Sequence, residues 1–250
     1  MRSLPDLEGH SNPSFQYLLP PGRGAQGEAL LAAKAARIAE EVHPTLVKRI
    51  GWAPAERTHL VLIDPVDASS GSATPFPNNT SYISLTAPPE NVLPFPLRFD
   101  DWLRQVIVHE YVHILHLDMN RGFTASIREI LGRHPLPVFV FNGAFPNLLQ
   151  PAWLIEGLAT YEETASGVSD RRDGAYTQMV LRMAILEDRF PSVEQAGGFE
   201  TWPGNPIQYL FGAAFYTYLA ERFGEDMLRE IRRNYSDNPL PFFVETNAEQ

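Results

Sequence analysis

Short apolar runs come early in the chain. Residues 15–20 (FQYLLP) have the look of a short strand, and the apolar run at 59–64 (HLVLID), which ends at a proline, suits a buried strand. Residues 81–86 (SYISLT) alternate in polarity among prolines, which are tolerated best at the edge of a sheet. We therefore predict a small N-terminal sheet with 81–86 as an edge strand.

Helical spacing of apolar residues takes over further along the chain. Residues 22–52 contain a long Ala-rich helix that Pro44 is expected to kink or end. A second helix follows Asp100 and Asp101, whose charges favour a helix N-terminus. Further helices are predicted at 124–133, 151–163, 173–190, 205–224 and 225–235. Strands first and helices later indicate an α+β fold.

The chain has the size of one large domain or two small ones. Its 250 residues are 44% hydrophobic, which is enough to bury a core, and no internal repeat is found. We assign residues 1–14 to a disordered or artificially added N-terminus and 15–235 to one folded domain. Residues 236–250 form a tail, and we expect the natural protein to continue beyond it.

Charge and composition restrict the classes of partner and ligand that the chain can have. A net charge of −10 argues against nucleic acid, and no apolar run is long and unbroken enough to span a bilayer. Without cysteine, any metal must be held by His and carboxylate side chains. The N-terminus lacks the apolar core of a secretory signal, so the location stays open; a periplasmic or secreted location is favoured if a signal peptide was removed.

The stretch HEYVH sets His109 and His113 four residues apart on the second helix. Four residues advance about 6 Å along a helix and about 40° around it, so both imidazoles point the same way and can share one ion. Glu110 can then reach a water at that ion without binding the ion itself. A buried helix that happens to contain two histidines is the alternative interpretation.

A metal held by two histidines needs a third protein ligand. Glu156 is the favoured candidate, because a carboxylate among Trp153, Leu154, Ile155 and Leu158 is costly to bury without a partner. An exposed stripe of an ordinary amphipathic helix is the alternative for Glu156. The other candidate ligands are His116, Asp118, His134, Glu162 and Glu163.

HEYVH followed by PAWLIEGLATYEE resembles the gluzincin zinc peptidases, the clan of thermolysin and the aminopeptidases, and is most similar to the bacterial peptidase-MA-like family. The resemblance implies a zincin-like fold with a zinc helix at 101–118 and a third-ligand helix at 151–165. It implies that His109, His113 and Glu156 bind one Zn²⁺ and that Glu110 is the general base. Members often carry a β-propeller downstream of this domain.

YLFG at 209–212 is similar to a Tyr-x-x-Gly of aminopeptidase relatives, which implies that Tyr209 stabilises the transition state. A plain core aromatic is the alternative for Tyr209, and Tyr161 and Tyr176 are weaker candidates for the role. Residues 119–150 form an insertion relative to those relatives. The segment that anchors a free N-terminus in aminopeptidases is missing; residues 73–84 stand there and are expected to be an edge strand at the cleft that pairs with an extended substrate.

The sequence thus predicts a zinc peptidase acting on peptides or proteins, more an endopeptidase than an aminopeptidase. The alternatives are a gluzincin-like module that binds a partner without turnover, and a hydrolase of another amide or ester.

Overall fold

A computed structural model describes residues 2–3, 15–19, 25–63, 70–86, 102–133, 144–193, 195–197, 202, 204 and 207–238. Its strands form one mixed sheet in the order β1-β2-β3-β5-β4. The strands are β1 (Arg2–Ser3), β2 (Phe15–Leu19), β3 (Thr58–Ile63), β4 (Gly71–Thr74) and β5 (Thr80–Ser84). Helices make up most of the remainder, which confirms the α+β prediction.

Helix α1 (Ala25–Ile50) connects β2 to β3, which pair in parallel. A parallel pair needs such a crossover. The helix continues past Pro44 for six residues, so the expectation that the proline ends it is wrong. Ala32, Ala35 and Ala39 are buried one turn apart on one face, and this face packs the helix into the core.

The edge strand predicted at 81–86 is not at the edge, and the single edge strand expected at 73–84 is instead the end of β4, a connection and all of β5. β5, which corresponds to 81–86, lies between β3, its parallel neighbour, and β4, its antiparallel neighbour. The outermost strand on this side is β4, which contains only GSAT and therefore lacks the β-branched run that predicts a strand. Among the described residues no strand pairs with the outer side of β4.

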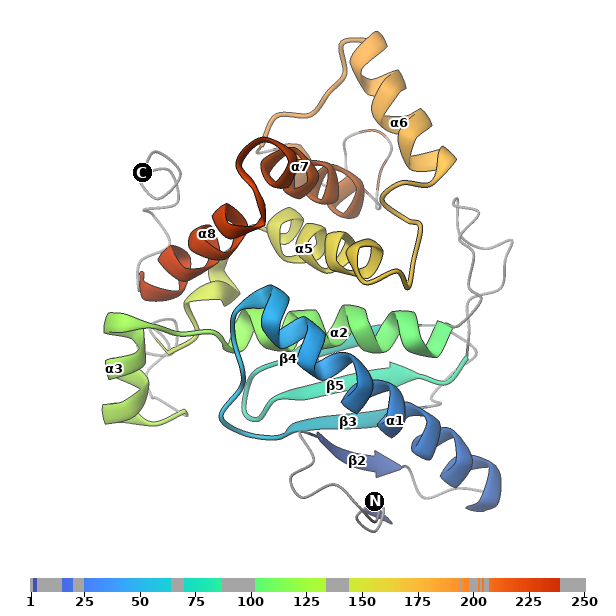
Figure 1. Cartoon of the computed structure of the whole chain (residues 1–250), viewed down its shortest axis with the longest axis vertical. Coiled ribbons are helices and arrows are strands. Elements are labelled where there is room, and N and C mark those ends of the chain that lie inside the picture. Colours follow the sequence, from blue (N-terminus) through green and yellow to red (C-terminus); the bar gives the residue numbers. More distant parts are fainter. Residues whose placement is uncertain are drawn as a thin grey trace.

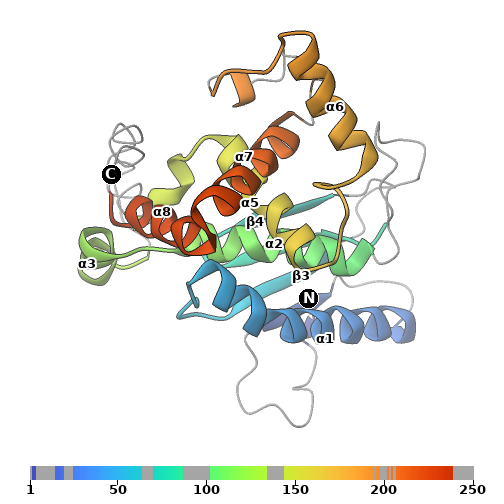
Figure 2. The same ribbon diagram turned by 45° about the horizontal axis from the view of Figure 1, so that its top comes forward.

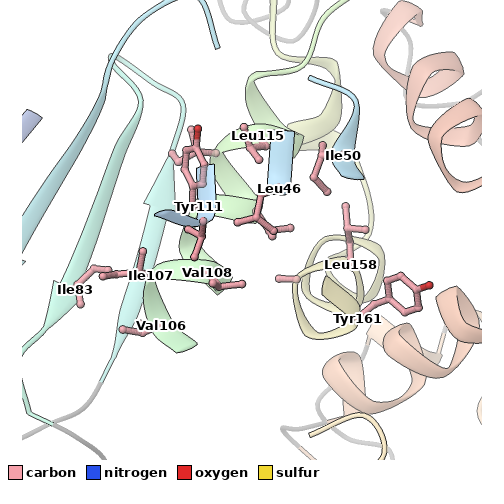
Figure 3. Close-up of a cluster of buried hydrophobic side chains, with 14 of the residues drawn as sticks. Leu46, Ile50, Ile83, Val106, Ile107, Val108, Tyr111, Leu115, Leu158 and Tyr161 are labelled. Atoms are coloured by element: carbon pink, nitrogen blue, oxygen red, sulfur yellow. The ribbon is translucent and has the colours of Figure 1, made fainter. Parts of the chain in front are cut away.

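Helix α2 (Trp102–Asp118) is the centre of the molecule. Figure 1 shows it between the sheet and α5 (Ala152–Ala165). Apart from Trp102 and Arg104, every residue of α2 is buried. Figure 3 shows its side chains Val106, Ile107 and Tyr111 in a cluster with Ile83 of the sheet and Leu46 of α1. A helix buried on all sides fixes its polar residues firmly.

The remaining helices follow the predicted ranges within a few residues. They are α3 (Gly122–Leu131), α6 (Ala175–Leu186), α7 (Ile207–Phe223) and α8 (Glu225–Asp237). Helices α5 and α7 lie side by side above α2 (Figure 1). Among the described residues no helix is both long and apolar enough to cross a bilayer. Asp100, Asp101 and almost all of the proposed N-terminus (1–14) and tail (236–250) lie outside the described residues.

Candidate metal centre

Three side chains from two helices meet at one point. His109 Nε2 of α2 lies 3.1 Å from His113 Nε2 and 3.2 Å from Glu156 Oε2 of α5. His113 Nε2 lies 3.3 Å from the same carboxylate oxygen. These three residues form a group that can hold a metal ion. The structure therefore brings together the three residues that the sequence predicted as ligands.

The triangle of ligand atoms fits a tetrahedral ion. Bonds of about 2.0–2.1 Å from a tetrahedral zinc place its ligand atoms about 3.3 Å apart. The three observed separations are 3.1, 3.2 and 3.3 Å. Two imidazole nitrogens and one carboxylate oxygen are also a donor set typical of zinc.

A close contact between two helix backbones sets the position of Glu156. A Cβ atom on Gly157 would overlap the backbone of Gly212, and one on Gly212 would overlap the carbonyl oxygen of Trp153. Because neither residue has a side chain, α7 can lie directly on α5. The residue before Gly157 is Glu156, and Tyr209 lies one turn before Gly212, so this contact also brings Tyr209 to the site.

Glu163 accepts a hydrogen bond from the ring nitrogen of His109 that is not part of the ligand triangle. Its Oε1 lies 2.5 Å from His109 Nδ1, so His109 donates its Nδ1 proton there and keeps Nε2 free for a metal. Gln105 donates to the other oxygen of Glu163 at 2.9 Å, and Arg171 lies 3.5 Å from its Oε1. Burial would raise the pKa of Glu163, but the charge of Arg171 and the hydrogen bond from His109 lower it.

The same carboxylates make the site favourable for a cation. Burial disfavours the charged imidazole of His109, but its hydrogen bonds with Glu156 and Glu163 outweigh burial and raise its pKa to about 10. Burial likewise disfavours the ionised carboxylate of Glu156, but the hydrogen bonds of both histidines lower its pKa well below the ordinary range. A proton and a metal ion therefore compete for this position.

Glu110 points at the sheet side of the site. A Cβ atom on Gly71 of β4 would overlap the Glu110 carboxylate and lie 2.8 Å from Val106 Cγ2, so only glycine lets the strand pass this close. Burial raises the pKa of Glu110, and the nearby charges of His109 and His113 oppose this. A carboxylate whose pKa is raised toward neutrality is suited to proton transfer.

Tyr209 is the best placed of the three tyrosines. Its ring centroid lies 6.1 Å from that of His109, and the guanidinium carbon of Arg171 lies 5.5 Å from its ring centroid. Tyr161 instead donates to Glu225 of α8 at 2.7 Å, and Tyr176 is on α6. The catalytic role of Tyr209 stays a prediction.

The other candidate ligands have different partners. Asp118 is buried and accepts hydrogen bonds from Trp52, Arg128 and Arg133, which leaves it no role as a surface group or as an acceptor for an imidazole. Glu162 accepts from Arg49 at 2.5 Å. His116 is fully buried outside the ligand triangle, and His134 lies outside the described residues.

Arg133 connects the sheet to the end of α2. It donates to Asp118 at 2.7 Å, to the carbonyl oxygen of Pro75 at 2.6 Å and to the side chain of Asn79. Residues 75–79 connect β4 to β5, so Arg133 fixes the strand that lies over Glu110.

Sequence reasoning missed Arg133 and Gly71. The role of Glu163 had a signal, because it lies seven residues after Glu156 and hence on the same helix face.

Comparisons of the chain with protein-family models, with curated proteins and with solved structures found no match.

Proposed function

We propose that the chain is a zinc-dependent peptidase of the gluzincin type with a zincin-like fold. The observation that carries this proposal is the triangle of His109 Nε2, His113 Nε2 and Glu156 Oε2, with sides of 3.1–3.3 Å. The adjacent Glu110 adds a base next to the ion position, for which a purely structural metal site has no use.

The proposed reaction is hydrolysis of a peptide bond by an activated water. Zinc, when bound, supplies a Lewis acid that polarises the substrate carbonyl and acidifies water. Glu110 takes the proton of the attacking water and delivers it to the leaving amine. Tyr209 donates a hydrogen bond to the developing oxyanion. Glu163 keeps His109 in the required tautomer throughout.

An extended peptide is the proposed substrate. The outer side of β4 has no strand partner among the described residues, and β4 passes directly over Glu110. A peptide that pairs with β4 has its backbone beside the base and the ion position. Pairing with β4 does not require the substrate to have a free amino terminus nearby, which favours an endopeptidase over an aminopeptidase.

Glu110→Gln tests the proposal. We expect the variant to keep one zinc per chain and to lose hydrolysis of a labelled unstructured protein such as casein by roughly 10²–10⁴-fold. Glu129→Gln on α3, which is exposed, is the matched control and should hydrolyse casein at the native rate. Unchanged turnover in Glu110→Gln would remove Glu110 from the mechanism. A native chain that holds zinc but cleaves nothing would favour a binding module instead.

A further inference from the structure

A basic hollow of about 380 Å³ lies apart from the metal centre, and none of its lining residues belongs to the site described above. Figure 2 shows the region, where the C-terminal end of α1 approaches α8. Four of the six lining residues are basic. The lining consists of Lys48, Ile50, Gly51, Arg121, Arg229 and Arg233.

Within the described part of the chain, only two of these four cations have a carboxylate partner. Arg229 pairs with Asp226, and Arg233 lies 3.8 Å from Glu230. Among the described residues no carboxylate lies within ion-pair distance of Lys48 or Arg121, and the buried Nε of Arg121 has no hydrogen-bond partner there. The hollow thus keeps two uncompensated positive charges in a chain whose net charge is −10.

Among the described residues, none of the four lining cations donates a side-chain hydrogen bond to the last carbonyl groups of α1. Basic side chains often satisfy the last carbonyl groups of a helix. Here the carbonyl oxygen of Val47 accepts from the backbone N–H of Gly51 at 2.9 Å, and that of Arg49 accepts from Arg232 at 3.0 Å. Arg232 does not line the hollow. Positive charges that lie close together and do not bind the helix carbonyl groups repel one another. An anion bound between them would relieve this repulsion.

We propose that this hollow binds a phosphate group, either as inorganic phosphate or as a small phosphate monoester. Two uncompensated charges match a dianion. The planar fork of a guanidinium matches the oxygens of a tetrahedral anion, and three of the four cations are arginines. A volume of about 380 Å³ has the size of a small-molecule site. This site is independent of the proposed peptidase activity.

Calorimetric titration with inorganic phosphate, in a phosphate-free buffer at constant ionic strength, tests the proposal. We expect one saturable site per chain in the native protein. The double variant Lys48→Ala/Arg121→Ala should bind phosphate at least about tenfold more weakly. The matched control Arg37→Ala/Arg182→Ala removes the same charge from exposed positions elsewhere and should keep the native affinity within about twofold. No saturable binding by the native chain, or equal affinity in the two double variants, would overturn the proposal.

Two further measurements identify the ligand and test whether the two residues act only in folding. Tighter binding of O-phosphoserine than of inorganic phosphate assigns the site to a monoester, and the opposite order assigns it to free phosphate. Without phosphate, Lys48→Ala/Arg121→Ala should melt at the native temperature or above, because repulsion is relieved. A lower melting temperature together with unchanged phosphate affinity would show that the two residues act only in folding.

Discussion

The candidate metal centre has two sides of different construction. The helical wall consists of α2, α5 and α7 and supplies all three proposed ligands as well as Glu110 and Tyr209. The sheet wall consists of β4 and residues 75–79 and supplies no ligand, only a backbone edge next to Glu110. The helical wall is held by a direct backbone contact between buried helices. The sheet wall is held by the antiparallel pairing of β4 with β5 and by the hydrogen bonds of Arg133, and Gly71 allows it to approach Glu110 closely.

This difference separates metal binding from substrate binding. A change in the helical wall displaces ligand atoms and disturbs the fold as well. A change in the sheet wall alters the approach to Glu110 and leaves the ligand triangle in place. The two walls therefore predict different combinations of lost stability, lost metal and lost turnover.

The largest effect is expected from Gly212→Ala in the helical wall. Its Cβ overlaps the carbonyl oxygen of Trp153, so α7 must move away from α5. We expect a loss of about 3 kcal/mol in the free energy of unfolding, measured by urea denaturation, together with weaker zinc binding. Tyr218→Ala on the exposed side of the same helix should change stability by no more than about 0.5 kcal/mol. Native stability of Gly212→Ala would contradict the described contact.

Gly71→Ala tests the sheet wall. The added methyl group overlaps the Glu110 carboxylate and must displace either that side chain or β4. We expect turnover to fall about 100-fold while zinc content stays native, because a displacement of about 1 Å is enough for such a loss. Exposed Ser72→Ala on the same strand is the control and should retain turnover. Loss of zinc along with turnover in Gly71→Ala would mean that the two walls are not separable.

Low pH should destabilise the helical wall, because it favours protonation of the buried His116. Burial, with smaller contributions from the charges of Arg232 and His113, lowers the pKa of His116 from 6.5 to about 3. The unfolded chain therefore binds more protons at this residue between these values, and its contribution to stability is present above pH 6.5 and lost as the pH falls toward 3.

The slope from this residue is at most about 1.4 kcal/mol per pH unit. Urea denaturation between pH 7 and pH 5 should show a smaller loss in His116→Leu than in the native chain. An identical loss in both proteins would exclude His116 as a cause.

Arg133→Lys should give the smallest effect. Lysine keeps the charge but cannot donate simultaneously in the directions of Asp118, Pro75 and Asn79. We expect KM to rise about tenfold at native zinc content, since the strand that pairs with substrate is less well fixed. Arg104→Lys, whose partner Glu41 is exposed, should leave KM unchanged. An unchanged KM in Arg133→Lys would show that Arg133 does not position the strand for substrate binding.

The helical wall was predictable from sequence because its signals are local. HEYVH fixes the relation of His109 to His113 by helix geometry alone, and apolar neighbours distinguish Glu156. The gluzincin interpretation itself stays a proposal. The sheet wall was not predictable, because β4 is only GSAT and its neighbour β5 reads as an edge strand among prolines. Its position depends on the contacts of Gly71 with Glu110 and of Arg133 with residues 75–79, which are more than thirty positions apart in the chain, and no local pattern encodes them.

Metal content measures the central claim most directly. The purified chain, dialysed against zinc and then against metal-free buffer, should hold one zinc ion, and Glu156→Gln should lose it. Glu162→Gln neutralises a carboxylate of the same helix that pairs with Arg49 instead, and should keep the ion. Equal zinc content in the two variants, or none in the native chain, would contradict the assignment of His109, His113 and Glu156 as one metal site.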